Sequence, residues 1–493
     1  MADPQSHEDS CVVDVEEKRL TQNDHHNNDE DEEIINADGD DGDIAALQSS
    51  DIVQVIPLED VSECGQQAVS DDDDDDYDME QGQTDNDENA KPASTNEQQF
   101  IDQSIVQFRA HTQDVFAITT HGQWCCSGGQ DDLAYVWNIT NTKQQQQQVF
   151  KCSGHGDSVT FVRFNHNGTK LATADLSGCV RVWVGFGNSD GGKTATIELL
   201  TAFSDAGDLE WIQWHPSTDI LLAGDKDGSI WMWLAADRTS TNCKVFAAGN
   251  ISCTNGLMLQ SGKELLAGYD DGTIRLWNLK SADSKLASVT GAVAVNDGLD
   301  GSITCCARHA RQPLAAFGNN RGLVQVVHCD TVKLTHVLCV DAPPPQQSNS
   351  PDTDAAMMNT DEAGSTTGSS SETSGSELRS IETVSFAKSD TSLVLAVGTV
   401  QGSLCIYDLS VNGGQLQHTC QHPAGVVKCE FIDSHLLLSA CLDGQVRLWD
   451  SRNAQMLKTY TGNRDAIYDL AVSDDRKYVL TAGEDTVCRV FEI

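Results

Sequence analysis

Hydrophobic residues occur in short runs over most of this chain. VRVWV and KLATA are typical: apolar residues alternate with other residues or fill the run, and Gly, Asn or Asp turns separate one run from the next. Runs this short, rich in Val, Ile and aromatic residues, are typical of β-strands rather than helices. The pattern therefore predicts an all-β body from residue 103 to residue 493.

The strand-like runs form repeats that align on one mostly aromatic position. Most neighbouring copies of this position are 42 to 50 residues apart, and one interval of 80 residues contains an insert. Five copies have Trp and three have a substitute, in the order Trp137, Trp183, Trp233, Trp277, Val327, Tyr407, Trp449 and Phe491. We therefore predict eight units of four short strands each.

Polar residues precede the aromatic position at regular spacings. An Asp lies six residues before it in five repeats, a Ser or Thr lies ten residues before it in four, and a His opens three. Repeats of this period with the order His, Ser or Thr, Asp, Trp resemble the WD40 repeat family, which forms β-propellers. The resemblance implies that each repeat is one blade.

The two ends of the repeat region can complete each other. The last repeat stops two residues after Phe491, before its fourth strand, while SIVQFR at 104–109 is strand-like and belongs to no repeat. Pairing these two segments would close the ring and remove exposed sheet edges. We expect a WD40 β-propeller of eight blades over residues 103–493. Seven blades is the alternative, since the fifth repeat has Arg321 and Val327 at the Asp and Trp positions.

Charge is distributed very unevenly along the chain. The net charge is -44, and residues 1–100 contribute -29 of it, from 32 Asp and Glu against 3 Lys and Arg. Low hydrophobicity with high net charge prevents a segment from burying enough surface to fold. We therefore expect residues 1–102 to be a disordered acidic arm, and 341–378, rich in Pro, Ser, Thr, Gly and acids, to be a disordered insert between blades 5 and 6.

Composition also argues against several classes of protein. The residues after Met1 are polar, so we expect no secretory signal, and no run approaches the roughly 18 apolar residues of a membrane span. The 17 cysteines contain no CxxC and lie mostly in apolar runs, as expected for reduced thiols of a cytoplasmic protein without a zinc site. No basic stripe for nucleic acid is visible, so we predict no direct nucleic-acid binding, no cofactor and no metal.

Two repeats contain residue types that could suggest a catalytic triad. We favour a structural hydrogen-bond chain that joins the strands of one blade, because buried polar groups must be paired and no GxSxG motif would expose a serine. We therefore predict that the protein is not an enzyme. The two sets are His111, Ser127, Asp131 and Trp137, and His422, Ser439, Asp443 and Trp449.

The segment AGDLEWIQWHP, residues 206–216, departs from the other repeats. Asp208, Glu210 and Trp211 fall at the start of an innermost strand, at the rim of one face of the propeller. Acids beside an aromatic suit a Lys/Arg-rich peptide, whereas a solvated loop with a packed Trp is the structural alternative. Catalysis is a third reading. Other acids predicted at the same rim are Asp114, Asp157, Asp225, Asp270, Asp300, Glu382, Asp465 and Glu484.

Several segments carry a more specific resemblance. DEEII, SGGQDDLAYVW, AGDLEWIQWHP, GYDDGTIRLWNLK, CQHPAGVV and CLDGQVRLWDSRN resemble the angio-associated migratory cell protein family over all eight repeats. The resemblance implies two roles, since vertebrate members are associated with cell migration and angiogenesis, and a fungal relative is a chaperone for a basic protein of the large ribosomal subunit. We predict a monomeric cytoplasmic escort for such a basic client, with a scaffold in migration signalling as the alternative. Nuclear and peripheral membrane locations remain open.

Overall fold

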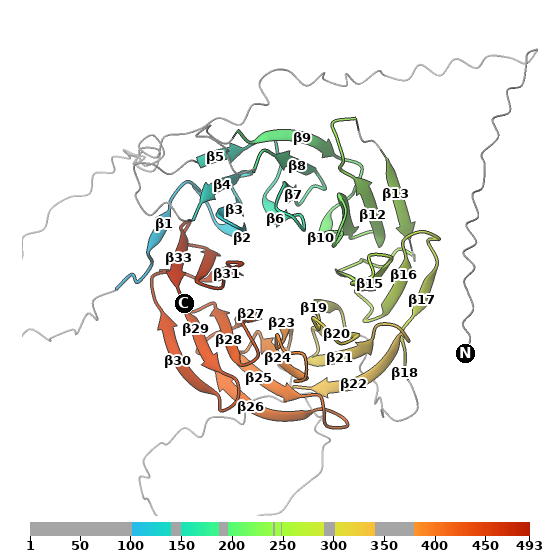
Figure 1. The fold of residues 1–493 in the computed structure, drawn as a ribbon, viewed down its shortest axis with the longest axis vertical. Coiled ribbons are helices and arrows are strands. Elements are labelled where there is room, and N and C mark those ends of the chain that lie inside the picture. Colours follow the sequence, from blue (N-terminus) through green and yellow to red (C-terminus); the bar gives the residue numbers. More distant parts are fainter. Residues whose placement is uncertain are drawn as a thin grey trace, which may run out of the picture. The chain divides into compact units, whose positions relative to one another are not determined.

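A computed structural model describes residues 101–139, 149–186, 196–239, 242–247, 249–289, 301–340 and 379–493. Within these ranges every regular element is a β-strand, and the strands form eight sheets arranged as a closed ring (Figure 1). The fifth repeat forms a complete blade, so eight blades are confirmed and the seven-bladed alternative is wrong. The arm over residues 1–100 and the insert over 341–378 lie outside the described residues.

Seven blades contain four antiparallel strands and blade 5 contains a fifth. Blade 1 is β2 (Val115–His121), β3 (Trp124–Gly129), β4 (Ala134–Asn138) and β5 (Val149–Cys152). Blade 2 is β6 (Val159–Phe164), β7 (Lys170–Asp175), β8 (Val180–Val184) and β9 (Glu198–Phe203). Blade 3 is β10 (Leu209–Trp214), β11 (Ile220–Asp225), β12 (Ser229–Leu234) and β13 (Cys243–Ala247). Blade 4 is β14 (Asn255–Met258), β15 (Glu264–Gly268), β16 (Ile274–Asn278) and β17 (Ser284–Leu286).

The second half of the ring repeats this order. Blade 5 is β19 (Ile303–Arg308), β20 (Leu314–Asn319), β21 (Leu323–His328) and β22 (Lys333–Cys339), with β18 (Ser288–Val289) added in parallel to β22. Blade 6 is β23 (Ile381–Phe386), β24 (Val394–Thr399), β25 (Ser403–Asp408) and β26 (Gln415–Gln421). Blade 7 is β27 (Val426–Phe431), β28 (Leu436–Cys441), β29 (Val446–Asp450) and β30 (Gln455–Tyr460). Blade 8 is β31 (Ile467–Val472), β32 (Tyr478–Gly483), β33 (Cys488–Glu492) and β1 (Val106–Phe108).

The ring closes through the first and last strands, as the sequence predicts. β1 pairs antiparallel with β33, with Val106 opposite Val490. An ion pair joins the same two segments: the buried Arg489 guanidinium places Nε 3.1 Å from an oxygen of Asp102. The closing strand therefore contributes both a ladder and a second carboxylate for Arg489, whose Nη1 also lies 2.6 Å from an oxygen of Asp485.

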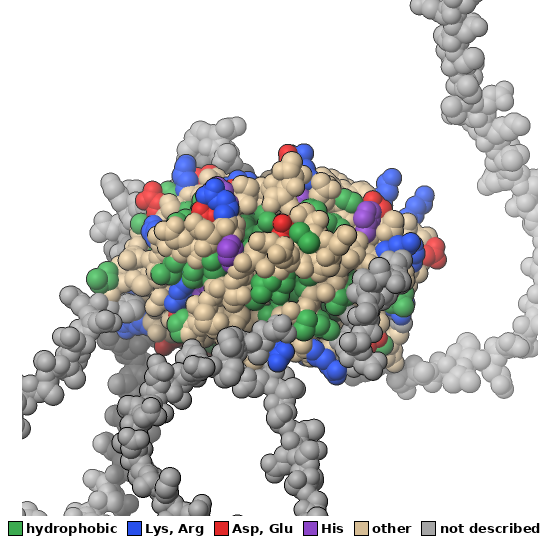
Figure 2. Space-filling model, turned by 90° about the horizontal axis from the view of Figure 1, so that it is seen from below, with side chains coloured by type: hydrophobic (Ala, Val, Ile, Leu, Met, Phe, Trp, Pro, Cys, Tyr) green, Lys and Arg blue, Asp and Glu red, His purple; other side chains and the backbone are tan. Residues whose placement is uncertain are grey.

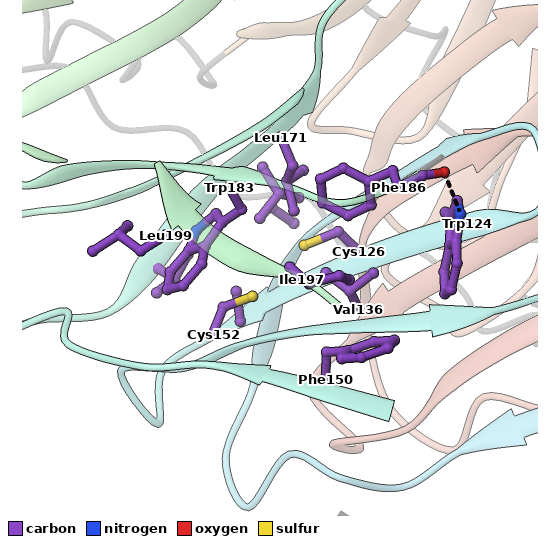
Figure 3. Close-up of a cluster of buried hydrophobic side chains, with 14 residues drawn as sticks. Trp124, Cys126, Val136, Phe150, Cys152, Leu171, Trp183, Phe186, Ile197 and Leu199 are labelled. Carbon is purple, nitrogen blue, oxygen red and sulfur yellow. Dashed lines mark hydrogen bonds between the residues drawn. The ribbon is translucent and has the colours of Figure 1, made fainter. Parts of the chain in front are cut away.

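The hydrophobic core lies between neighbouring blades. Second strands such as β7 are buried along their whole length because blades cover both faces, which explains the continuous small and apolar run KLATA. Figure 3 shows one such interface, where Trp124 and Phe150 of blade 1 meet Trp183 and Phe186 of blade 2. The outer strands are different: most of β30 is exposed. Edge-on, Figure 2 shows charged side chains along the two faces and hydrophobic or neutral ones on the outer wall between them.

The described cysteines are free, and most are packed inside the blades. Burial raises the pKa of the adjacent thiols of Cys125 and Cys126 well above the usual value, and it raises the pKa of Cys306 to about 12. Protonated thiols of this kind behave as small apolar groups rather than as nucleophiles.

One face of the ring, here called the leading face, carries two kinds of loop from every blade. The leading loop precedes the first strand of a blade, and the middle turn joins its second and third strands. The first residue of each middle turn donates its backbone N–H to the leading loop of the same blade, at 2.8–3.1 Å. These turn-start residues are Gln130, Leu176, Lys226, Asp270, Asn320, Val400, Leu442 and Glu484. The opposite surface is called the trailing face.

Candidate functional site

Blade 2 contains a complete hydrogen-bond chain on its leading side. His155 lies between Asp175 and Thr173, with Nδ1 3.0 Å from a carboxylate oxygen and Nε2 2.8 Å from the hydroxyl. The indole N–H of Trp183 donates to the same hydroxyl at 2.9 Å. The His155 and Asp175 side chains have no exposed surface, and burial lowers the pKa of His155. No substrate can reach these groups, so the chain is structural.

The sequence missed Asp175 as a member of this chain. It lies eight residues before Trp183, whereas the Asp of the aligned repeats lies six residues before the aromatic position. Asp175 ends β7 and still reaches His155, because the middle turn lets either position point inward. An acid at the end of the run KLATAD was the available signal.

The predicted chain in blade 1 needs one correction. His111 lies 3.0 Å from Asp131 and 2.9 Å from Ser127, but the indole N–H of Trp137 has no hydrogen-bond partner among the described residues. The Trp137 ring instead stacks on Phe108 of the closing strand, with 4.8 Å between ring centroids. Packing against β1 replaces the last bond of the chain.

The predicted chain in blade 7 needs a different correction. His422 and Trp449 both bond to the Ser439 hydroxyl, at 2.8 and 2.9 Å. Asp443 does not bond to His422, because it forms a bidentate pair with Arg447. His422 turns its Nδ1 to the Gly402 carbonyl at 3.2 Å, and burial lowers its pKa to about 4.

Blade 3 has no such chain, and this decides the position of Asp225. The residues that match His155 and Thr173 are Asp205 and Ala223. Asp225 is only 2% exposed and accepts from the indole N–H of Trp231 at 2.7 Å. The prediction that Asp225 lies at the binding rim is therefore wrong, because its buried carboxylate accepts from the partly buried indole of Trp231 and from the backbone of its own turn.

Trp211 of AGDLEW is also a packing residue. Its side chain points into the interface with blade 4, where the indole N–H donates to the Cys253 carbonyl at 3.0 Å. Glycines of both blades make room for the ring: a Cβ at Gly224 would lie 2.1 Å from the indole nitrogen, and one at Gly256 would lie 2.3 Å from its six-membered ring. Trp211 is only 7% exposed. The expectation that its ring forms a cation–π contact with a client is therefore wrong, and the ring is a packing residue.

Glu210 reaches the surface because the strand bulges at this position. In β10, Leu209 faces Asp225 and Trp211 faces Gly224, so Glu210 is the extra residue. A bulge turns one side chain out of the regular alternation. The same irregularity occurs at the second residue of the inner strand in seven blades, and all seven residues are partly exposed: Phe116, Thr160, Glu210, Thr304, Glu382, Val427 and Tyr468.

Four of the bulge residues, Thr304, Glu382, Val427 and Tyr468, line a central cavity of about 410 Å³. Glu382 lines this cavity, as do Tyr468 and the ion pair of Lys428 and Asp469, whose charged atoms are 3.2 Å apart. The wall therefore offers carboxylates, hydroxyls and amides to a guest. Its lining also includes the thiols of Cys305, Cys306 and Cys429, and burial raises the pKa of each of them.

Two groups of acids lie on the leading face near these bulges. In blades 3 and 4, burial raises the pKa of Glu210, Lys226 opposes that rise, and the negative charges of Asp270 and Asp208 add to it. Asp208 forms an exposed ion pair with Lys226 at 3.0 Å. In blades 8 and 1, burial raises the pKa of the Tyr468 hydroxyl, and Glu484, Asp114 and Asp465 raise it further.

Acids are concentrated on one sector of the leading face. In the described residues, the leading loops and middle turns of blades 8, 1, 2, 3 and 4 contain many carboxylates against Arg109, Lys226 and Arg464. We call this sector the acidic arc: Asp114, Asp132, Asp157, Asp205, Asp208, Asp227, Asp270, Asp271, Asp465 and Glu484. The described parts of the corresponding segments of blades 5 to 7 contain Arg321, Arg379 and one acid, Asp443. Asp300 lies outside the described residues, and Asp157 is exposed.

One group of side chains among the described residues is spaced closely enough to be compared with a metal site. The ligand atoms of His155, Asp175 and Cys179 lie within 4.8 Å of one another. Both ring nitrogens of His155 already have partners, and both oxygens of Asp175 accept from protein donors. His155 and Asp175 therefore already use their ligand atoms in the hydrogen-bond chain of blade 2.

Family models and relatives match this architecture. The model described as WD domain, G-beta repeat, matches residues 102–138, 146–184, 199–233 and 243–278, and a model described as nucleolar protein 10-like, N-terminal domain, matches residues 292–493. The human angio-associated migratory cell protein is 34% identical over 394 residues, which cover 79% of this chain and 80% of that protein. The ribosome assembly protein SQT1 of Saccharomyces cerevisiae is 26% identical and covers 79% of this chain and 86% of itself.

Solved structures show the same fold. The crystal structure of Chaetomium thermophilum Sqt1 bound to the N-terminus of the ribosomal protein L10 has a TM-score of 0.64 at 20% identity. The match covers 80% of this chain and all of that one. In the part of this chain that the structure describes, no helix has the length and hydropathy needed to cross a membrane.

Proposed function

This chain belongs to the angio-associated migratory cell protein family, and on that premise we propose that it is a non-enzymatic WD40 propeller that escorts a basic protein of the large ribosomal subunit in the cytoplasm. Lys and Arg side chains of the client would lie on the acidic arc. Charge-assisted hydrogen bonds to carboxylates are stronger than neutral ones, and several together would hold a flexible basic segment. Covering that segment would suppress its aggregation and its nonspecific contacts with RNA.

The acidic arc is the observation that carries this proposal. Carboxylates from five neighbouring blades point to one face, whereas the trailing face mixes both signs. A field of one sign attracts an oppositely charged partner and speeds its association. Two relatives support the choice of client: a ribosome assembly protein of yeast, and a structure whose partner is the N-terminus of a ribosomal protein.

The buried chains support the non-enzymatic part of the proposal. The residues that could suggest a triad lie inside blades, where each His is held by a hydroxyl and by a carboxylate or carbonyl. A nucleophile has to reach a substrate, and these hydroxyls do not.

The deciding experiment is an affinity pull-down from cell lysate with the intact chain and two charge-reversed variants. Asp208→Lys/Asp270→Lys changes two exposed acids of the arc, and Asp330→Lys/Asp390→Lys changes two exposed acids of the trailing face by the same charge. We expect one basic large-subunit ribosomal protein to be retained by the intact chain and the trailing-face variant and to be lost by the arc variant.

Other outcomes have definite meanings. Retention of that client by both variants would place its site away from the arc. If no ribosomal protein is retained and signalling or cytoskeletal proteins bind all three forms, the escort function is wrong and the scaffold function of the family is favoured.

A further inference from the structure

The turn-start residues show which chemistry each blade presents on the leading face. At this position the fold requires only a backbone N–H, which bonds to the leading loop in every blade. All eight side chains are exposed, so the interior does not select them. The side chains are charged in blades 3, 4 and 8, polar in blades 1 and 5, and apolar in blades 2, 6 and 7. Their chemistry therefore reflects what lies outside the ring.

Two neighbouring blades place apolar side chains next to each other at this position. Val400 of blade 6 is 39% exposed and Leu442 of blade 7 is 37% exposed. Gly425 lies between them: a Cβ built on it would lie 2.8 Å from the Val400 carbonyl oxygen and 3.2 Å from Leu442 Cδ1. The two side chains therefore belong to one surface.

The surroundings of these two residues are apolar as well. The leading loop of blade 7 adds Pro423, which is exposed, and Ala424, which is partly exposed. Val427, the bulge residue of blade 7, continues the surface to the central cavity. We call these five residues the apolar patch: Val400, Pro423, Ala424, Val427 and Leu442. Asp443, which lies in the same middle turn as Leu442, is paired with Arg447.

The apolar patch borders the acidic arc directly. Leu442 shares its middle turn with Gly444, which has a φ of +77° and packs on the leading loop of blade 8. A Cβ at Gly444 would lie 2.9 Å from the carbonyl oxygen of Asp465. Asp465 and Glu484 belong to the acid group beside Tyr468, so one extended segment can touch both surfaces.

We propose that the apolar patch is a subsite for a hydrophobic side chain of the same peptide segment whose Lys and Arg lie on the acidic arc. The proposal rests on the escort function and narrows its ligand class from any polycation to basic segments that contain an apolar residue. The patch is continuous with the arc, and the arc is negatively charged. A basic segment that also contains an apolar residue fits both surfaces. Apolar contact persists when salt screens the charges, so the patch adds affinity that does not depend on ionic strength.

Two fluorescent peptides of equal length and equal arginine content provide the test. One has leucines at the positions where the other has serines. Fluorescence anisotropy at low and high salt would compare the intact chain, Val400→Ser/Leu442→Ser and the control Leu457→Ser, which removes an exposed leucine of the outer wall of the same blade. We expect the leucine peptide to bind the intact chain and the control about tenfold more tightly, and to lose this advantage with the double variant.

The outcomes separate this inference from the proposed function. If both peptides bind equally and the double variant changes neither, the subsite is wrong while the escort function stands. A leucine advantage that the double variant keeps places the apolar contact elsewhere and also overturns the subsite. If neither peptide binds, or if Asp465→Ser/Glu484→Ser leaves both affinities unchanged, the acidic arc does not bind basic segments and the proposed function fails with it.

Discussion

Blades 2 and 3 are neighbours with the same four strands, yet they hold their strands together differently. Blade 2 connects two strands and its leading loop by the buried chain of His155, Asp175, Thr173 and Trp183. Blade 3 lacks this His and hydroxyl and uses packing of Trp211 on two glycines instead. The fold therefore needs a filled and paired interface between blades, and it accepts more than one way of filling it.

The difference also explains AGDLEW. Without the His, the leading loop of blade 3 contributes no side chain to a buried chain, and Asp208 stays outside with Lys226. The bulge then separates Glu210, which faces out, from Trp211, which faces in. The motif therefore combines a packing residue, Trp211, with two surface acids, Asp208 and Glu210.

The largest effect is expected where blade 3 has replaced hydrogen bonds by packing. Trp211→Ala would leave a cavity between blades 3 and 4 and an unpaired Cys253 carbonyl. We expect a loss of about 3–5 kcal/mol in the free energy of unfolding, measured by chemical denaturation. Trp211→Phe is the control, because it keeps most of the volume and loses the indole bond. A loss under about 1 kcal/mol for Trp211→Ala would mean that the indole is not a packing residue.

A smaller loss is expected from breaking the chain of blade 2. Thr173→Val keeps the shape but leaves the indole N–H of Trp183 and Nε2 of His155 without a partner. Unpaired buried groups of this kind cost about 2–3 kcal/mol together, and Thr173→Ser should recover most of that amount. Equal stability of the two variants in denaturant would show that the chain does not hold blade 2 together.

Acid should weaken blades 2 and 7, which contain His155 and His422. Burial lowers the pKa of His422 from 6.5 to about 4, and it also lowers that of His155. As the pH falls below 6.5, the unfolded state takes up a proton on His422 that the folded state does not bind until about pH 4. The contribution of the neutral His422 to the free energy of unfolding is therefore complete above pH 6.5 and is lost as the pH falls toward 4. The slope approaches about 1.4 kcal/mol per pH unit for each His.

The control for this pH effect comes from the protein itself. Asn463 occupies the equivalent position in blade 8 and accepts from the Thr481 hydroxyl at 2.9 Å. The His422→Asn variant should therefore fold, and its unfolding midpoint should fall less between pH 7.5 and pH 5 than that of the intact chain. An unchanged dependence on pH would mean that His422 does not contribute to it.

The smallest effect on stability is expected at Asp208. Its ion pair with Lys226 is exposed on both sides, and exposed pairs contribute little to the free energy of unfolding because solvent screens them. Asp208→Ser should therefore leave the unfolding midpoint almost unchanged and weaken salt-dependent binding of the basic client. Asp175→Ser in blade 2 should do the opposite, since its carboxylate is fully buried. A large stability loss for Asp208→Ser would assign AGDLEW wholly to the fold.

The sequence by itself determined the ring. A repeat of eight aromatic positions, strands with turn residues between them, and an unassigned strand before the first repeat predicted eight blades and their closure, because these signals are local or periodic. It also placed Asp208, Asp270 and Glu484 on one face, since equivalent loops of a propeller share a face.

Only the tertiary structure decided which side chains point inward. Trp211 turns into the interface because glycines in a neighbouring strand and a neighbouring blade leave space for it, and Asp225 turns inward because Trp231 needs an acceptor. Arg447 takes Asp443 from its expected partner. Each of these choices depends on contacts between strands or blades, which the pattern within one repeat does not specify.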